Sequence, residues 1–274
     1  MTRKGCAHLG KRQRRAEKVY GTADLHIHSL ASDGLNSPKQ ILEYVEEETD
    51  LDVIAITDHD DVSGALEARS LWAKGAYSFE VVVGEEITTQ SGHLMALEIS
   101  SCIRMLQSLE RTIRVIRAQG GLVIVPHPLA WYSAGLRRWR IESIMRQPAD
   151  MRFDGMESFN ATVAGRRTNR AAIALTNALC LGHVGGSDSH DLRTIGSART
   201  LFPGRSWNDL RHAIVERTST AEGEFYGISS YANIAVPQMF RSLVLLPGKR
   251  VKKMAGWFLS DRGLIAPETP PPPR

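Results

Sequence analysis

Short apolar runs alternate with amphipathic segments along most of the chain, from residue 20 to about residue 203. Runs rich in β-branched and aliphatic residues predict strands. They cover residues 22–28, 53–57, 79–83, 122–126, 155–159 and 183–187. Residues 88–99 interrupt the alternation and predict a hairpin that turns at Gln90, Ser91 and Gly92.

Helix signals fill the spaces between the predicted strands. Ser37 before Pro38 is typical of an N-cap followed by proline at the first helical position. Ser63 is expected to cap a helix that ends at Gly75, and residues 103–119 predict another helix, which ends at a pair of glycines. Alternation of strand and helix predicts an α/β fold with a mainly parallel sheet, closed or open, and helices outside it.

The composition indicates one large domain with ample material for a core. The chain has 274 residues, 42% hydrophobic and 23% charged. It contains no apolar run of the length that a membrane-spanning helix needs and no apolar core of a secretory signal, so a cytoplasmic location is expected. Cys6, Cys102 and Cys180 are scattered, which predicts neither a disulfide framework nor a thiolate zinc site.

Positive charge is concentrated at the two ends of the chain. Residues 1–20 carry seven Lys or Arg against one Glu, and residues 241–274 carry seven against two acidic residues, although the formal net charge is only +4. Such tails are more often solvated extensions than sites for nucleic acid or anionic membranes. We expect a basic leader at 1–19, a barrel domain at 20–227, an amphipathic helical segment at 228–260 and a disordered Pro-rich tail at 261–274.

The segment 228–260 combines apolar residues with the basic run 249–253 and then Trp257 and Phe258. Two interpretations remain open. A helix that packs on the barrel is favoured over a helix that lies in a membrane interface.

Ionisable residues gather where the predicted strands end. In ADLHIHSLASDG, His26 and His28 lie at i and i+2, so a strand directs both imidazoles to one face. Alone, this pair would indicate only a polar strand end. The other strand ends and the hairpin add further nitrogen and oxygen ligands, and together the set is hard to explain without metal: Asp33, His59, Glu85, His93, His127, Asp188 and His190.

The ligand set predicts the metal chemistry. Imidazoles and carboxylates without thiolates suit zinc, iron or manganese, and about nine ligands are too many for one ion. We therefore expect two or three divalent ions, which favour hydrolysis of a phosphoester. GxSxG, Walker and GxGxxG motifs are absent from the sequence.

The motifs ADLHIHS, SDG, AITDHD, GEEIT followed by GHLMAL, IVPHP and GGSDSH together resemble the PHP (polymerase and histidinol phosphatase) superfamily. The resemblance covers residues 21–203. It implies a distorted seven-stranded β/α barrel with a trinuclear metal centre, in which a hydroxide that bridges two metals attacks phosphorus.

The same resemblance implies roles for individual residues. The first metal would be held by His26, His28, Glu85 and Asp188; the second by Glu85, as a bridge, with His93 and His127; the third by Asp33, His59 and His190. Glu85, Asp188 and His190 are therefore also the expected catalytic residues.

Substrate contacts are expected from cations and polar groups that follow the strands. These are Arg137, Arg138, Asn160 and Arg193. The expected substrate is a small phosphomonoester or a nucleotide, with a 5′-exonuclease on short oligonucleotides as the alternative. A module that binds nucleic acid or membranes through its basic tails and a metal-dependent amidohydrolase are the other hypotheses.

Overall fold

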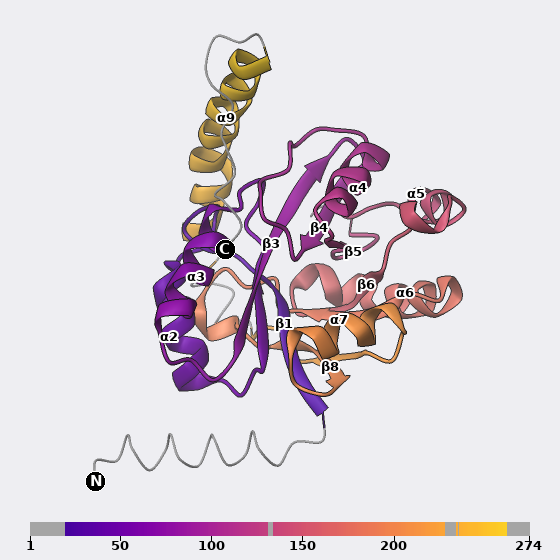
Figure 1. The fold of residues 1–274 in the computed structure, drawn as a ribbon, viewed down its shortest axis with the longest axis horizontal. Helices are drawn as coiled ribbons and strands as arrows, with labels where there is room; N and C mark the ends of the chain where they lie inside the picture. The colour runs from indigo at the N-terminus through magenta and orange to yellow at the C-terminus, as the bar shows by residue number, and fades with distance from the viewer. Residues whose placement is uncertain (1–19, 131–133, 228–233, 235, 262–274) are drawn as a thin grey trace.

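The computed structural model describes residues 20–130, 134–227, 234 and 236–261 (Figure 1). Nine strands form one sheet in the order β7-β6-β5-β4-β3-β2-β1-β8-β9. The strands are β1 Tyr20–Ile27, β2 Val53–Ile56, β3 Glu80–Thr89, β4 Gly92–Leu97, β5 Leu122–Val125, β6 Gly155–Asn160, β7 Gly182–Gly186, β8 Ala198–Pro203 and β9 Thr220–Gly223.

The sheet is mixed and curls into a nearly closed barrel. Neighbours pair in parallel from β1 to β3 and from β5 to β7, whereas β4, β8 and β9 pair antiparallel. The end of β1 then meets the segment after β7, because Ile27 bridges Ser189 in parallel and the His28 N–H donates to the Ser189 carbonyl. This closure brings the first and last parallel strands to one rim.

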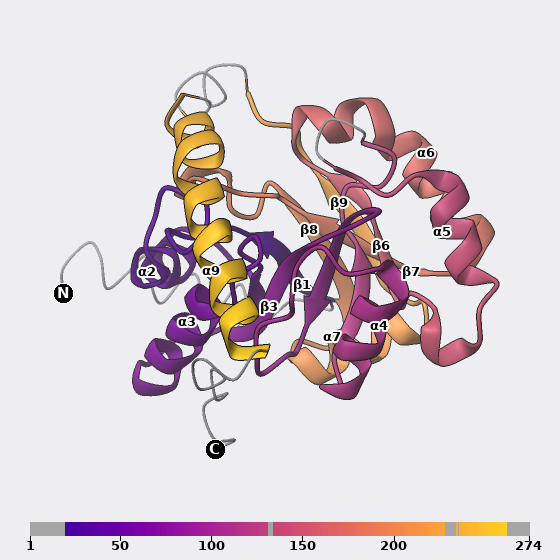
Figure 2. The ribbon, with the colours of Figure 1, turned by 90° about the horizontal axis from the view of Figure 1, so that it is seen from above.

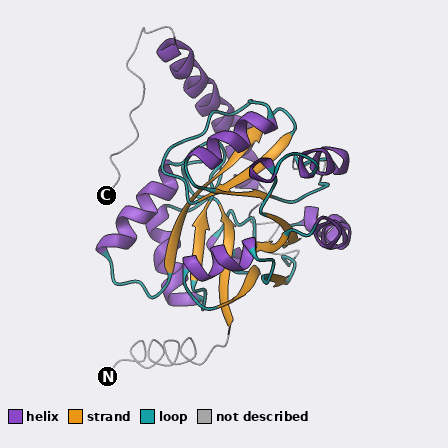
Figure 3. Cartoon of the chain, turned by 45° about the vertical axis from the view of Figure 1, so that its right-hand side comes forward, coloured by secondary structure: helices purple, strands orange, loops and turns teal. Residues whose placement is uncertain are grey.

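Helices surround the sheet (Figure 3). They are α2 Pro38–Glu48, α3 Ser63–Lys74, α4 Leu109–Ala118, α5 Arg138–Met145, α6 Val163–Leu179, α7 Trp207–Val215 and α9 Leu246–Asp261. Short helices η2 Ala149–Met151 and η3 Leu192–Thr194 lie between strands, and the π-helical turn η4 Arg241–Leu245 leads into α9.

Three apolar clusters pack these layers together. Side chains of β1, β2, β4 and β5 meet α7 in one cluster, which includes Leu25, Met95, Ile124 and Leu210. Two further clusters lie between the sheet and helices α2 to α5. Both faces of β2 are buried, which explains its uninterrupted apolar sequence VIAI.

The structure confirms an α/β fold but corrects its details. The sheet has nine strands rather than seven, and its antiparallel pairs make it less parallel than expected. Strands β8 and β9 were not predicted from the sequence. The predicted hairpin is present as β3 and β4, and Ser37 caps α2 in a capping box with Gln40.

Two helix predictions are wrong in their boundaries. Ser63 is the first residue of α3 rather than its cap, and no side chain caps this helix. The helix expected over 103–119 begins only at Leu109, where Ser108 accepts the Arg111 N–H. The Ile103 N–H donates instead to the Glu85 carboxylate, which holds this stretch outside the helix.

The C-terminal segment is helical where it is described, at 236–240, in η4 and in α9. Figure 2 shows α9 in yellow, and its residue Arg250 pairs with Asp60 in the segment after β2. No helix of the described ranges is both long and apolar enough to cross a membrane. The expected leader at 1–19 lies outside the described residues, as does the tail beyond Asp261.

Candidate metal centre

Five histidines from β1, β2, β4, β5 and the segments that follow these strands form a ring at the rim of the barrel. His26 lies in β1 and His28 directly after it, His59 follows β2, His93 lies in β4 and His127 follows β5. Consecutive members have ring centroids 4.6 to 5.7 Å apart: His26–His28, His28–His59, His59–His93, His93–His127 and His127–His26. The structure thus brings together residues that are up to about 100 positions apart in sequence.

Glu86 of β3 reaches all five histidines. Its Oε1 lies 2.7 Å from His127 Nε2 and 2.8 Å from His93 Nδ1. Its Oε2 lies 3.0 Å from His59 Nδ1, and the corresponding distances to Nε2 of His26 and His28 are 3.3 and 3.5 Å. One fully buried carboxylate is therefore the hub of the cluster.

The prediction of Glu85 as the bridging ligand is wrong. Side chains alternate across a strand, and Thr88 pairs with His93 in the β3–β4 hairpin, so His93, Thr88 and Glu86 share one face. Glu85 lies on the other face, where it accepts the Ile103 N–H and the Cys102 thiol hydrogen. Burial raises the pKa of Glu85 to about 8, although the Cys102 and Ile103 hydrogen bonds lower it.

The remaining ligands complete the cluster beside His28. Asp188 Oδ1 lies 3.3 Å from His28 Nε2, and His190 stacks on His28 with ring centroids 4.2 Å apart. Asp33 Oδ1 lies 3.2 Å from His190 Nε2. The His190 Nδ1–H donates to the carbonyl oxygen of Asp188, which leaves Nε2 as the nitrogen with a free lone pair.

The electrostatics favour ionised carboxylates within the cluster. Burial alone would raise the pKa values of Asp33, Glu86 and Asp188, but the surrounding histidines outweigh it and hold all three well below the usual range. Burial lowers the pKa of His28 to about 3. For His59, burial also lowers the pKa, but Glu86 and Asp33 outweigh it and raise the value to about 9.

These residues fit divalent metal ions. Four overlapping groups of three or four ligands have their donor atoms within 4.8 Å of one another. Several buried nitrogen and oxygen atoms that could bind a metal have no hydrogen-bond partner among the described residues. They are both ring nitrogens of His28, Asp33 Oδ1, Nδ1 of His59 and His127, and His190 Nε2. Buried polar atoms normally have partners, and ions would supply them here.

Sequence analysis missed two buried acidic residues behind the ring. Glu157 of β6 accepts hydrogen bonds from His26 Nδ1 at 2.7 Å and from the His127 N–H at 2.6 Å. Asp24 accepts the N–H groups of Ser187 and Gly196. A glutamate in the middle of the predicted strand 155–159 was the available signal for Glu157.

Asn160 lies behind the ring as well, so its assignment as a substrate contact needs correction. Its amide nitrogen donates to Glu157 at 3.1 Å and to Asp188 at 3.4 Å. Its oxygen accepts from the Thr162 hydroxyl and N–H. Because the side chain is buried and engaged with protein groups, it orients carboxylates rather than substrate.

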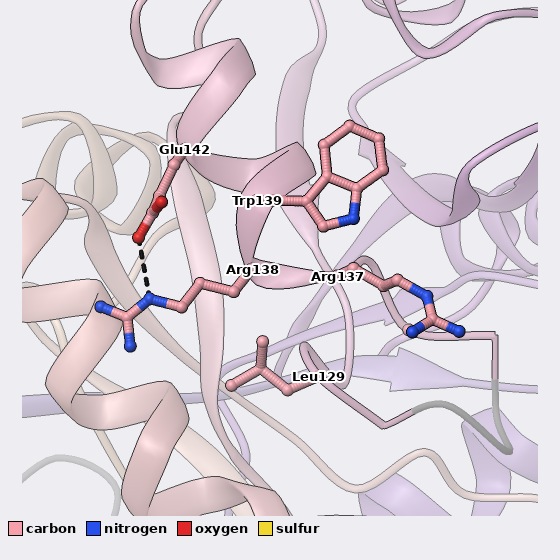
Figure 4. Close-up of a pocket in the computed structure, with 6 residues that line it drawn as sticks. Leu129, Arg137, Arg138, Trp139 and Glu142 are labelled. Carbon is pink, nitrogen blue, oxygen red and sulfur yellow. Dashed lines mark hydrogen bonds and ion pairs between the residues drawn. The ribbon is translucent and has the colours of Figure 1, made fainter.

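The predicted arginines differ in their surroundings. Arg137 and Arg138 line a hollow of about 710 Å³ with Leu129, Trp139 and others. Figure 4 shows Arg138 turned to Glu142, at 2.8 Å, and Arg137 extending the other way. Arg193 pairs with Asp191 at 2.7 Å and is largely exposed, so its charge is already matched.

Residues of the C-terminal helix contact the loops that carry the cluster. Ser242 Oγ donates to Asp33 Oδ2 at 2.5 Å, and Arg241 donates to the carbonyl oxygens of Leu30 and Ser32. Arg250 pairs with buried Asp60 at 2.7 Å. The basic run was visible in the sequence, but its contacts were not.

Comparison with known proteins identifies the family. The model of the PHP-associated family matches residues 166–219. An uncharacterized protein of Methanocaldococcus jannaschii is 35% identical over 150 residues, which are 51% of this chain and 81% of that protein. The chain belongs to the PHP family. This confirms the resemblance based on the strand-end motifs.

Two solved structures have a similar fold. A two-domain protein from Bacteroides vulgatus, which contains a predicted PHP-like metal-dependent phosphoesterase, matches with a TM-score of 0.63 and 21% identity over 81% of this chain and 70% of that one. PsfC from Pseudomonas syringae matches with a TM-score of 0.56 and 17% identity over 83% of this chain and 100% of that one. At these identities the likeness concerns the fold alone.

Proposed function

We propose that this PHP protein is a metal-dependent phosphoesterase whose cluster holds two or three divalent ions. The supporting observation is Glu86, a buried carboxylate whose oxygens lie within 3.5 Å of a ring nitrogen of each of the five histidines. The ligands would be His26, His28, Asp33, His59, Glu86, His93, His127, Asp188 and His190. Nitrogen and oxygen donors of this kind suit zinc, iron or manganese.

The chain's own groups are arranged for this chemistry. Bound divalent ions would polarise a phosphoryl oxygen and provide an activated water at neutral pH. Asp33, Glu86 and Asp188 are held ionised, which is the form that binds metal. Glu157 accepts the Nδ1–H of His26 and so turns the other ring nitrogen, Nε2, toward Glu86 and Asp188.

The substrate in this proposal is a small phosphomonoester, with nucleotides included. An exonuclease that acts on the 5′ end of short oligonucleotides is the second candidate, and one observation favours it. Trp139, 65% exposed, lies beside Arg137 in the hollow of Figure 4, where an indole could stack on a base.

A phosphate-release screen tests the proposal. The substrates would be nucleotides, sugar phosphates and short 5′-phosphorylated oligonucleotides. An amide substrate is included to test the alternative activity, that of an amidohydrolase. We expect release with manganese, iron or zinc, and a loss of at least about 100-fold in His59→Ala. His212→Ala is the matched control because this exposed histidine of α7 is outside the cluster. Absence of release with every metal would refute the phosphoesterase.

A further inference from the structure

The helix formed by residues 236–240, η4 and α9 has an inner face that contacts the rim of the cluster. Arg241 and Lys249 donate to carbonyl oxygens of the loop after β1, and Arg250 pairs with Asp60 after β2. Near the end of α9, Arg104 pairs with Asp261 at 2.6 Å. These polar contacts define which face of the helix points toward the protein.

The opposite face is apolar and exposed. Ten of the eighteen exposed large hydrophobic side chains of the described residues lie between Val236 and Leu259. Five of them recur at helical spacing and define an apolar stripe: Val236, Phe240, Leu243, Val251 and Met254. Their exposed fractions of 43 to 72% mean that no described part of the chain covers the stripe.

The charge of the same helix selects the class of partner. Residues 236–261 contain five basic residues, Arg241, Lys249, Arg250, Lys252 and Lys253, against the single acidic residue Asp261. Two copies that met stripe to stripe would bring two such positive helices together, which costs free energy. An anionic lipid surface offers apolar depth for the stripe and negative charge for the exposed Lys252.

We propose that the apolar stripe binds the surface of an anionic lipid bilayer, with the helix lying in the interface. The segment lies on the bilayer rather than spanning it, in agreement with its mixture of charged and apolar residues. Since Ser242 on the inner face contacts Asp33, the cluster would lie about one helix diameter, ~10 Å, behind the lipid surface. The inference does not depend on the reaction that the cluster catalyses.

Flotation of the full chain with lipid vesicles tests this proposal. One set of vesicles contains phosphatidylglycerol and phosphatidylcholine, and the other contains phosphatidylcholine alone. We expect at least tenfold more protein bound to the anionic vesicles, and a loss of at least tenfold in the double variant Leu243→Ser, Val251→Ser. The matched control is Ile173→Ser, Val215→Ser, which removes exposed aliphatic side chains from α6 and α7 and should bind as the wild type does.

Two results would overturn the proposal. One is absence of binding to anionic vesicles, or equal binding by the stripe variant, which would place any lipid contact elsewhere in the chain. The other is a dimer in sedimentation equilibrium without lipid that the stripe variant dissociates, which would assign the stripe to a second copy. Melting temperatures and metal contents of all variants show whether each protein is folded.

Discussion

Glu85 and Glu86 are consecutive in sequence, both fully buried, and placed in opposite environments. Glu86 faces five histidines, whereas Glu85 accepts hydrogen bonds from Cys102 and Ile103. The strand's alternation and the two-residue turn of the hairpin already place His93 on the face of Glu86. If the hairpin register had been worked out in full, Glu86 rather than Glu85 could have been predicted from the sequence as the candidate ligand.

The raised pKa of Glu85 predicts a pH-dependent stability. Its pKa of about 8 in the folded protein exceeds the ordinary 4.5, so its contribution to stability is complete below pH 4.5 and is lost as pH rises through about 8. Glu85→Gln cannot ionise. Between pH 5 and 8 its free energy of unfolding should rise relative to the wild type by up to about 1.4 kcal/mol per pH unit.

Denaturant unfolding of both proteins across this pH range measures the effect. Glu47→Gln, on the exposed face of α2, should follow the wild-type curve throughout. Parallel curves for wild type and Glu85→Gln would contradict the assignment of Glu85 to a desolvated site.

Glu157 acts on metal binding through His26 and His127. Glu157→Gln exchanges one acceptor oxygen for an amide group that cannot accept a hydrogen bond, so the orientation of one histidine is lost. We expect a metal affinity about 10 to 100 times weaker in competition with a chelating dye. Glu216→Gln, at the exposed end of α7, is the control. An unchanged affinity in Glu157→Gln would show that the residue does not support the ring.

At the scale of elements, strands β1 to β7 were predictable from the local sequence, whereas β8 and β9 were not. The runs VIAI of β2 and LVIV of β5 match their predictions because burial on both faces demands apolar residues. Strand β9 has the sequence TAEG, which carries no strand signal, and pairs only because β8 lies beside it. The contacts of α9 depend on backbone carbonyls of distant loops, which no local pattern reveals.

The attachment of α9 should depend on its polar inner face. Asp60 is buried, and Arg250 is its ion-pair partner. Arg250→Met removes the charge and keeps most of the stem, so we expect amide hydrogens of α9 to exchange at least about tenfold faster, as expected for local opening. Lys252→Met is the matched control, since Lys252 is exposed on the same helix. Equal exchange in both variants would mean that other contacts hold the helix.

At the scale of the whole molecule, closure of the sheet assembles the site. Ligands from β1 and from the segment after β7 meet because these two segments are joined at Ile27 and Ser189. The order of the motifs along the chain indicated that the ligands converge at one rim of the sheet. It did not indicate that β8 and β9 extend the sheet beyond β1. Glu86 lies at the centre of these converging segments, within 3.5 Å of all five histidines.

Metal content per chain tests most directly whether Glu86 is the hub of a metal cluster, by plasma mass spectrometry on protein purified without chelator. Wild type and Glu85→Gln should carry two or three divalent ions per chain, and Glu86→Gln should carry at least one fewer. Retention of the full content by Glu86→Gln, or less than one ion in the wild type after supply of zinc, iron and manganese, would contradict the account.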